Sequence, residues 1–141
     1  MRGVTETPLA TTTYDAVDKA ARYVADINPQ LTLETVVVSA PYTLDGMFRA
    51  FVECVKNAQS SPEYMALTDQ GERPKIIVIV DAISSTPALL MPWERVVEFC
   101  KLQENVLSLV DAAHAVGHIV GINLNEVRPD FFISVGAIFA R

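Results

Sequence analysis

Two aspartates close two of the most apolar segments of this 141-residue chain. Asp81 ends the run KIIVIVD (75–81), and Asp111 ends the run VLSLVD (106–111). An acid in such a place can cap the helix that follows, hold a metal ion, or pair with a protonated ring nitrogen of a bound heterocycle. For either acid taken alone, capping is the favoured interpretation. Neither neighbourhood offers a clear third metal ligand.

Two histidines lie just beyond the second acid. His114 and His118 form H-x-x-x-H, a spacing that places both imidazoles on one helical face, as in many zinc sites. Gly117 interrupts the stretch, and no acidic general base lies inside the motif. We therefore expect no metal site and a locally packed or hydrogen-bonded His118. His114 differs, because it follows Asp111 by three residues and would face the same crevice.

Two serines follow Asp81 in the sequence. Ser84 and Ser85 could donate hydrogen bonds to a ligand, or they could only form a turn before Pro87, and the turn is favoured. The chain contains no nucleophile elbow of the serine hydrolases, no glycine-rich dinucleotide motif and no P-loop.

Strands and helices must position these side chains, and the spacing of apolar residues predicts both. Helices are expected over 14–27, 44–58, 93–100 and 112–117, and strands over 34–40, 75–81, 106–111 and 131–139. Residues 59–74 look like a long loop, and residues 1–10 like a poorly ordered terminus. This alternation predicts an α/β fold, with a mostly parallel sheet and flanking helices. Ligands of such sheets bind beyond the carboxyl ends of the strands, which is where both acids stand.

Composition narrows the classes of function. Half of the residues are hydrophobic, and the net charge is −6 with eleven scattered Lys and Arg. The basic surface typical of nucleic-acid binding is therefore missing, and the same charge argues against an anionic membrane surface. No segment has the 18 or so consecutive apolar residues of a membrane helix. With two cysteines and no signal-like start, the expected compartment is the cytoplasm.

Three motifs carry a resemblance to a known family. They are VDAAHAVGH (110–118), PDFF (129–132) and TTTYDAVDKAARYV (11–24). The chain resembles the large domain of class V aminotransferase-fold enzymes, which are fold type I and use pyridoxal 5'-phosphate (PLP). It is most similar to the fungal branch around isopenicillin N epimerase and the ergothioneine-pathway carbon–sulfur lyase. The likeness covers about residues 11–134 and implies that 11–141 is part of a cofactor-binding large domain.

The resemblance implies roles for four residues. Asp111 would pair with the pyridinium nitrogen of PLP, keeping the ring protonated so that it can draw electrons from the substrate. His114 would contact the ring hydroxyl, and Tyr14 would stack on the ring face. Ser84 would line the substrate side. The family often has Gly where this chain has Asp15.

The family pattern stops after Ser134. Relatives continue to a His-Lys pair, whereas this chain reads VGAIFAR, which puts Ala137 and Ile138 where the His and the Schiff-base lysine would stand. The last lysine is Lys101. The family's upstream phosphate-binding loop and its small carboxy-terminal domain also have no counterpart. The resemblance therefore implies no catalytic residue for covalent attachment, and PLP held without a covalent bond.

The function implied is a PLP-dependent lyase or epimerase acting on an amino-acid-derived metabolite of fungal secondary or sulfur metabolism. Its partners would be a small amino-acid-like substrate and a second copy of the chain in a homodimer. The chain is expected to be incomplete for catalysis on its own. The alternative is a truncated, non-catalytic relative or pseudoenzyme that acts as a binding module. An unrelated flavodoxin-like domain would require the motifs to be coincidences.

Overall fold

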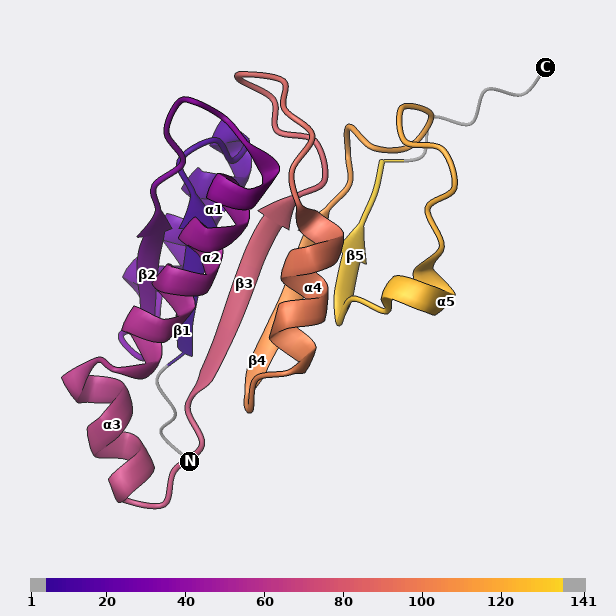
Figure 1. Cartoon of the computed structure of the whole chain (residues 1–141). Coiled ribbons are helices and arrows are strands. Elements are labelled where there is room, and N and C mark those ends of the chain that lie inside the picture. Colours follow the sequence, from indigo (N-terminus) through magenta and orange to yellow (C-terminus); the bar gives the residue numbers. More distant parts are fainter. Residues whose placement is uncertain (1–4, 136–141) are drawn as a thin grey trace.

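A five-stranded parallel sheet organises the molecule. The structure is a computed structural model and describes residues 5–135. The strands lie in the order β2-β1-β3-β4-β5, and neighbouring strands are all parallel (Figure 1). In chain order the elements are β1 (Thr5–Ala10), α1 (Asp15–Ile27), β2 (Leu31–Val36), α2 (Leu44–Gln59), α3 (Pro62–Asp69), β3 (Lys75–Asp81), α4 (Trp93–Lys101), β4 (Val106–Asp111), α5 (Leu124–Val127) and β5 (Phe131–Ile133). The predicted α/β class is confirmed.

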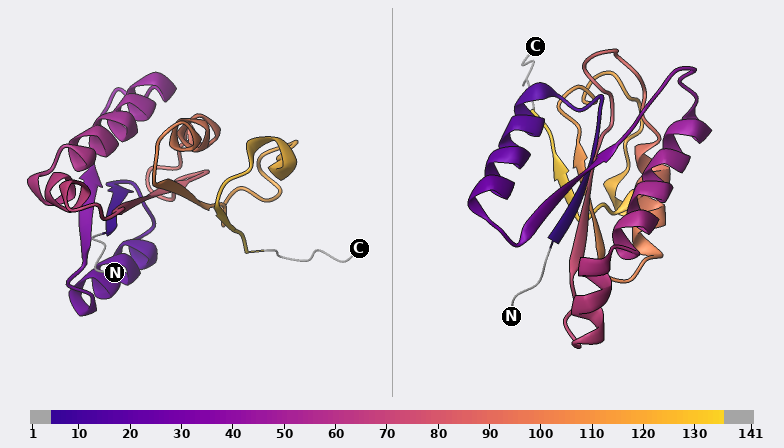
Figure 2. Two further views of the ribbon diagram at one scale, coloured as in Figure 1. Left: turned by 90° about the horizontal axis from the view of Figure 1, so that it is seen from below. Right: turned by 90° about the vertical axis from the view of Figure 1, so that its left-hand side faces the viewer.

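The helices cover the two faces of the sheet unequally. Figure 2 shows α1 on one face, and α2 and α4 together on the other. The chain leaves β1 through α1 to reach β2, then returns through α2 and α3 to β3 on the far side of β1. The crossovers thus change face between β1 and β3, which makes this pair the topological switch point of the sheet. In open α/β sheets the ligand crevice forms at such a point.

The core lies between the sheet and the α2–α4 layer. Alternate residues of β3 point into it, namely Ile76, Val78 and Val80, and all three are fully buried. They pack with Phe51 of α2 and Val97 of α4 in one cluster. Since side chains alternate along a strand, the intervening residues of β3 point to the face that carries α1.

The longer apolar segments match their sequence-based predictions. The predicted helices 14–27, 44–58 and 93–100 agree with α1, α2 and α4 to within one residue at each end. The predicted strands 75–81 and 106–111 agree with β3 and β4. These elements position both acids.

The prediction of a poorly ordered stretch over 1–10 is wrong for residues 5–10, which form β1 in the interior of the sheet. Its sequence, TETPLA, hides the strand because it combines an acid and a proline with few apolar residues. Glu6 pairs with Ile76 and Leu9 with Ile79, and the ladder to β3 is interrupted between them, where Pro8 has no N–H to donate. Pairing on both sides overrides the weak local preference.

Three further elements differ from their predictions. The expected loop 59–74 contains α3, which starts because the Ser61 hydroxyl accepts a hydrogen bond from the Tyr64 amide at 3.1 Å. The strand expected at 34–40 is β2, which begins earlier, at Leu31, and ends earlier, at Val36. No helix forms over 112–117, where Gly117 has a positive φ of 85°, and the short helix is α5 instead.

The last predicted strand, 131–139, is seen as Phe131–Ile133, and residues 136–139 lie outside the described part of the chain. No helix among residues 5–135 is both long and apolar enough to cross a membrane.

Candidate functional site

The carboxyl ends of β1, β3 and β4 converge at the switch point. Tyr14 follows β1 and is the residue just before α1, while Asp81 ends β3 and Asp111 ends β4. The two acids are direct partners in the β3–β4 ladder. Because paired residues of parallel strands point to the same side, both acids lie on the face that carries α1.

Asp111 is half-buried and held in place by the chain that follows it. Its Oδ1 accepts a hydrogen bond from the Ala113 amide at 2.9 Å, and its backbone carbonyl accepts one from the Ala82 amide at 2.7 Å. The predicted capping is thus correct in part, since the carboxylate satisfies an amide two residues on, as in an Asx turn. No helix begins there, so Asp111 is a turn residue whose side chain lies on the face of the sheet that carries α1.

Asp81 has a different environment. Its side chain is 3% exposed, and neither carboxylate oxygen has a hydrogen-bond partner within residues 5–135. Burial, together with the negative charge of Asp111, raises the pKa of Asp81 from 3.8 to about 7. The backbone N–H of Tyr14 lies near enough to offset a small part of the rise in pKa, without forming a hydrogen bond. The capping interpretation is wrong for Asp81.

The side chains of Tyr14 and His114 lie against each other next to these acids. The rings of Tyr14 and His114 lie edge to face, with 6.2 Å between centroids and 78° between planes. The Tyr14 side chain remains 49% exposed. The structure therefore brings together three of the four predicted cofactor residues, Tyr14, Asp111 and His114. His118 is exposed, so it does not pack as one of its two expected roles required, and its expected local hydrogen bond stays a prediction.

A cavity of about 580 Å³ runs from this cluster along the sheet beneath α1. Tyr14 and Asp111 form its polar end. The rest of its wall is apolar and includes Val17, Ala20, Val24, Ile77, Ile79, Leu109 and Ile133. An apolar wall beside a half-buried carboxylate favours a flat, partly charged ligand.

Ser84 does not join this cluster. It is fully buried in the loop after β3, where its hydroxyl donates to the Pro87 carbonyl at 2.7 Å and accepts from the Leu89 amide at 3.2 Å. Both bonds close the loop on itself. This is the turn role that the sequence favoured, and the predicted ligand role of Ser84 finds no support in these contacts.

The lysines lie away from the acids. Lys75 stands at the opposite end of β3 from Asp81, about 20 Å away at ~3.3 Å per residue. Lys56 is exposed on α2, which covers the other face of the sheet. The Lys101 amine donates to the Val127 carbonyl. The residue predicted at the position of the Schiff-base lysine, Ile138, lies outside the described residues, as does Ala137.

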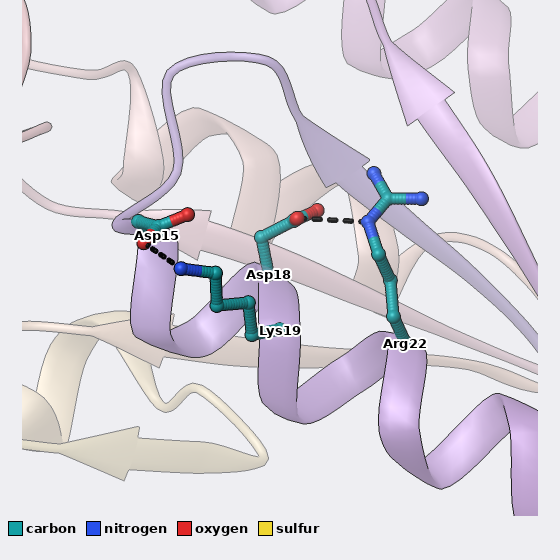
Figure 3. A network of polar contacts seen from close by, with 4 residues as sticks. All are labelled: Asp15, Asp18, Lys19 and Arg22. Atoms are coloured by element: carbon teal, nitrogen blue, oxygen red, sulfur yellow. Dashed lines mark hydrogen bonds and ion pairs between the residues drawn. The ribbon is translucent and has the colours of Figure 1, made fainter.

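Lys19 belongs to a separate surface network on α1, drawn in Figure 3. It pairs with Asp15 at 2.6 Å, and Arg22 pairs with Asp18 at 2.8 Å, both one helical turn apart. Exposed ion pairs of this kind contribute little to stability. Their spacing of one helical turn indicates that they support α1 rather than form a ligand site. No three His, Cys, Asp or Glu side chains gather as a metal site would require in the described part of the chain.

The sequence placed Asp81 at the ligand edge of the sheet but favoured a capping role for it and assigned it no contact with the cofactor. What the sequence could not supply was the absence of a capping partner, which depends on where the following loop goes.

No protein-family model matches the chain. Hercynylcysteine sulfoxide lyase of Schizosaccharomyces pombe is 50% identical over 56 residues, which are 40% of this chain and 14% of that protein. The L-cysteine desulfhydrase-like protein lolT1 of Epichloe uncinata is 32% identical over 123 residues, or 87% of this chain and 24% of that protein. The homologues are cysteine desulfhydrase-like proteins and hercynylcysteine sulfoxide lyase. The chain thus spans 14% to 24% of the length of these relatives.

Solved structures agree with the homologues in fold. The cystine C-S lyase C-DES, solved with its reaction product cysteine persulfide, superposes with a TM-score of 0.69 at 15% identity, over 95% of this chain and 31% of that one. The cysteine desulfurase CsdA of Escherichia coli gives 0.59 at 14% identity, over 94% and 28%. The fold is that of part of a fold type I large domain. Flavodoxin-like sheets share the strand order, but the homologues named above are of another kind.

Proposed function

We propose that this chain supplies the cofactor-binding part of a PLP-dependent enzyme that cleaves a carbon–sulfur bond in an amino-acid-derived substrate. The observation that carries the proposal is the convergence of Asp111, Tyr14 and His114 at the switch point, within a segment shared with the homologues. The names of those relatives favour sulfur-containing amino acids as substrates. The epimerase chemistry implied by the sequence would use the same three residues, and those names favour carbon–sulfur cleavage over it.

The residues present fit the cofactor ring. A pyridinium nitrogen needs an anionic acceptor, and Asp111 offers a carboxylate with only one oxygen occupied by a backbone amide. A flat aromatic face needs a ring against which to stack, and Tyr14 presents an exposed one at the mouth of the cavity. The position of His114 beside Tyr14, with 6.2 Å between the ring centroids, supports a contact with a polar substituent of the same cofactor ring.

The chemistry supplied by PLP is electron withdrawal from the substrate carbon, which weakens the bond that leads to sulfur loss. The work of this chain is to keep the ring nitrogen protonated. A carboxylate held beside an apolar wall does this well, because a charge-assisted hydrogen bond strengthens where water is scarce. The Ala113 amide fixes the orientation of Asp111, so little reorganisation is needed on binding.

We further propose that the 141-residue chain holds PLP without a covalent bond and does not catalyse the reaction by itself. The positions of Lys19, Lys56, Lys75 and Lys101 support this, since none lies at the Asp111 end of the cavity. In this state the chain is a binding module. A homodimer and a cytoplasmic location remain part of the proposal.

Equilibrium dialysis of PLP against the purified chain tests the proposed function. We expect saturable binding that weakens about tenfold or more in Asp111→Asn, because a charge-assisted bond is worth about 1.5–3 kcal/mol. Asp69→Asn, on the exposed end of α3, is the matched control and should bind as wild type does. Binding that is absent, or equal in Asp111→Asn, would refute the site.

Borohydride reduction of the mixture tests the mode of binding. We expect no stable adduct on any lysine when the reduced protein is digested and examined by mass spectrometry. A single lysine carrying reduced cofactor would overturn the non-covalent proposal.

A further inference from the structure

Asp81 is a buried acid whose burial nothing in the fold yet explains. Its side chain is 97% buried, and both carboxylate oxygens lack a hydrogen-bond partner in the described region. An ionised carboxylate in such a place is costly, and native proteins keep one only with a partner. The group that acts on Asp81 from β4 is the Asp111 carboxylate, and from the start of α1 the backbone amide of Tyr14. His114 lies beyond the Tyr14 ring.

Asp111, in contrast, lies in an environment that favours a negatively charged carboxylate. It is only half-buried, and the Ala113 amide donates to it at 2.9 Å. The two residues are register partners on adjacent strands, which lie about 4.8 Å apart, with both side chains on one face. The negative charge of Asp111 opposes ionisation of Asp81, so a proton on one of the two acids relieves their repulsion. Their environments decide where it resides.

We propose that Asp81 is a positioning residue of the candidate site, a neutral carboxylic acid that donates its proton toward Asp111 so that the pair carries one negative charge. The inference rests on the proposed function in one respect, since the cation matched to that charge is the ring nitrogen bound by Asp111. The pair then neutralises one protonated heterocycle, without a second buried charge left over.

The electrostatics of the site agree with this division of roles. The pKa of Asp81 is raised to about 7, first by burial and then by the charge of Asp111. No Lys or Arg is among the groups that act on Asp81 within residues 5–135. Between about pH 4 and pH 7 the acid is therefore mostly neutral, whereas an ordinary aspartate is already ionised there. The same logic assigns different protonation states to paired carboxylates in known active sites.

Carbon-13 NMR of the side-chain carboxyl groups, in the ligand-free 141-residue chain, tests the proposal directly. Asp81→Asn identifies the Asp81 resonance by its loss, and Asp69→Asn identifies an exposed reference. We expect Asp81 to titrate near pH 7. In Asp111→Asn the midpoint of Asp81 should fall, because the neighbouring charge is gone, and remain above 3.8, because burial persists. A role confined to packing would not couple the two titrations.

Two results would overturn the proposal. One is an Asp81 midpoint that coincides with that of Asp69, and the other is a midpoint unchanged by Asp111→Asn. Asp81→Asn keeps the shape and a hydrogen-bond donor of the neutral acid, so it should fold, and it should bind PLP within about twofold of wild type. Asp81→Ala should bind about tenfold more weakly, as expected for loss of one hydrogen bond of about 1.4 kcal/mol to an ion.

The dialysis and the NMR titration separate the two proposals. If wild type does not bind PLP while Asp81 titrates with Asp111 as described, the proposed function fails and the carboxyl pair stands. If PLP binds while Asp81 titrates like Asp69, the function stands and the pair fails.

Discussion

Asp81 and Asp111 share a residue type, a register and a sheet face, yet their chemistry differs. Asp81 is buried beside the start of α1, and its carboxylate has no hydrogen-bond partner among the described residues. Asp111 is half-buried, and its carboxylate accepts a hydrogen bond from the Ala113 amide. The sequence predicted that both end strands at the ligand edge, but not which of them remains charged. That distinction depends on a few neighbouring atoms, which no spacing of residues encodes.

The raised pKa of Asp81 makes stability depend on pH. In the unfolded chain the group titrates near 3.8, and in the folded chain near 7, so the folded state holds an extra proton between these values. The free energy of unfolding should therefore fall as pH rises from about 4 to about 7, and level off above. The loss approaches roughly 4 kcal/mol, at about 1.4 kcal/mol per pKa unit.

Urea denaturation across this pH range measures the effect. Asp81→Asn should remove most of the decline, and it should be more stable than wild type at pH 8. Asp69→Asn should preserve the wild-type profile. A wild-type stability that rises between pH 4 and 7 in step with Asp81→Asn would contradict the assignment.

At the scale of elements, the aspartate of the PDFF motif ties β5 to β4. Asp130 Oδ2 accepts from the backbone amide of Ser108 at 2.8 Å and from its hydroxyl at 2.9 Å, and its own amide donates to that hydroxyl at 3.1 Å. Ser108 is fully buried within β4. The ladder between the two strands starts just beyond, at Leu109 and Phe131. The Asp130 side chain thus accepts a hydrogen bond from β4 at a position that precedes the first backbone pair of β4 and β5.

Asp130→Ala should destabilise the chain by about 2 kcal/mol, because it leaves a buried donor without its charged acceptor. Asp130→Asn keeps one acceptor oxygen and should lose less. Urea denaturation measures both, and equal losses for the two variants would refute the role of the acceptor. Hydrogen exchange at the Ser108 amide should accelerate in Asp130→Ala.

Some elements were predictable from sequence and others were not, for physical reasons. The strands KIIVIVD and VLSLVD carry long apolar runs, so their limits follow from composition. TETPLA becomes a strand only because β2 and β3 pair with it on both sides. Ser61 looks like a loop residue until its hydroxyl is seen to cap α3. Ser84 illustrates the reverse, since a family position implied a ligand contact, and the local turn uses the hydroxyl instead.

At the scale of the whole molecule, the sheet is covered unequally. The α2–α4 layer buries Ile76, Val78 and Val80 of β3 fully, whereas α1 has no buried residue, and Tyr23, Val24 and Ile27 are exposed. Apolar residues of β3, β4 and β5 line the cavity beneath it. An exposed apolar surface of this kind favours association.

We therefore expect the isolated chain to self-associate through the face that carries α1. Val24→Lys, in the wall of the cavity, should raise the monomer fraction in sedimentation velocity. Leu102→Lys, at an apolar residue just after α4 that is more exposed than Val24 and lies outside the cavity, should not. A wild-type chain that is monomeric at high concentration, or an equal response to both variants, would contradict the expectation.

The interior position of β1 also has a consequence for the order in which the crevice forms. Asp81 and Asp111 belong to one β3–α4–β4 unit, whose ends are close in sequence and can meet early in folding. Tyr14 reaches them only when β1 docks beside β3, a contact between segments about seventy residues apart, and such non-local pairings form slowly. We expect the two carboxyl groups to come together first, at a sheet edge that Tyr14 does not yet cover. When β1 inserts beside β3 it brings Tyr14 to them, so the site would become able to bind an aromatic ring only in the last stage of folding.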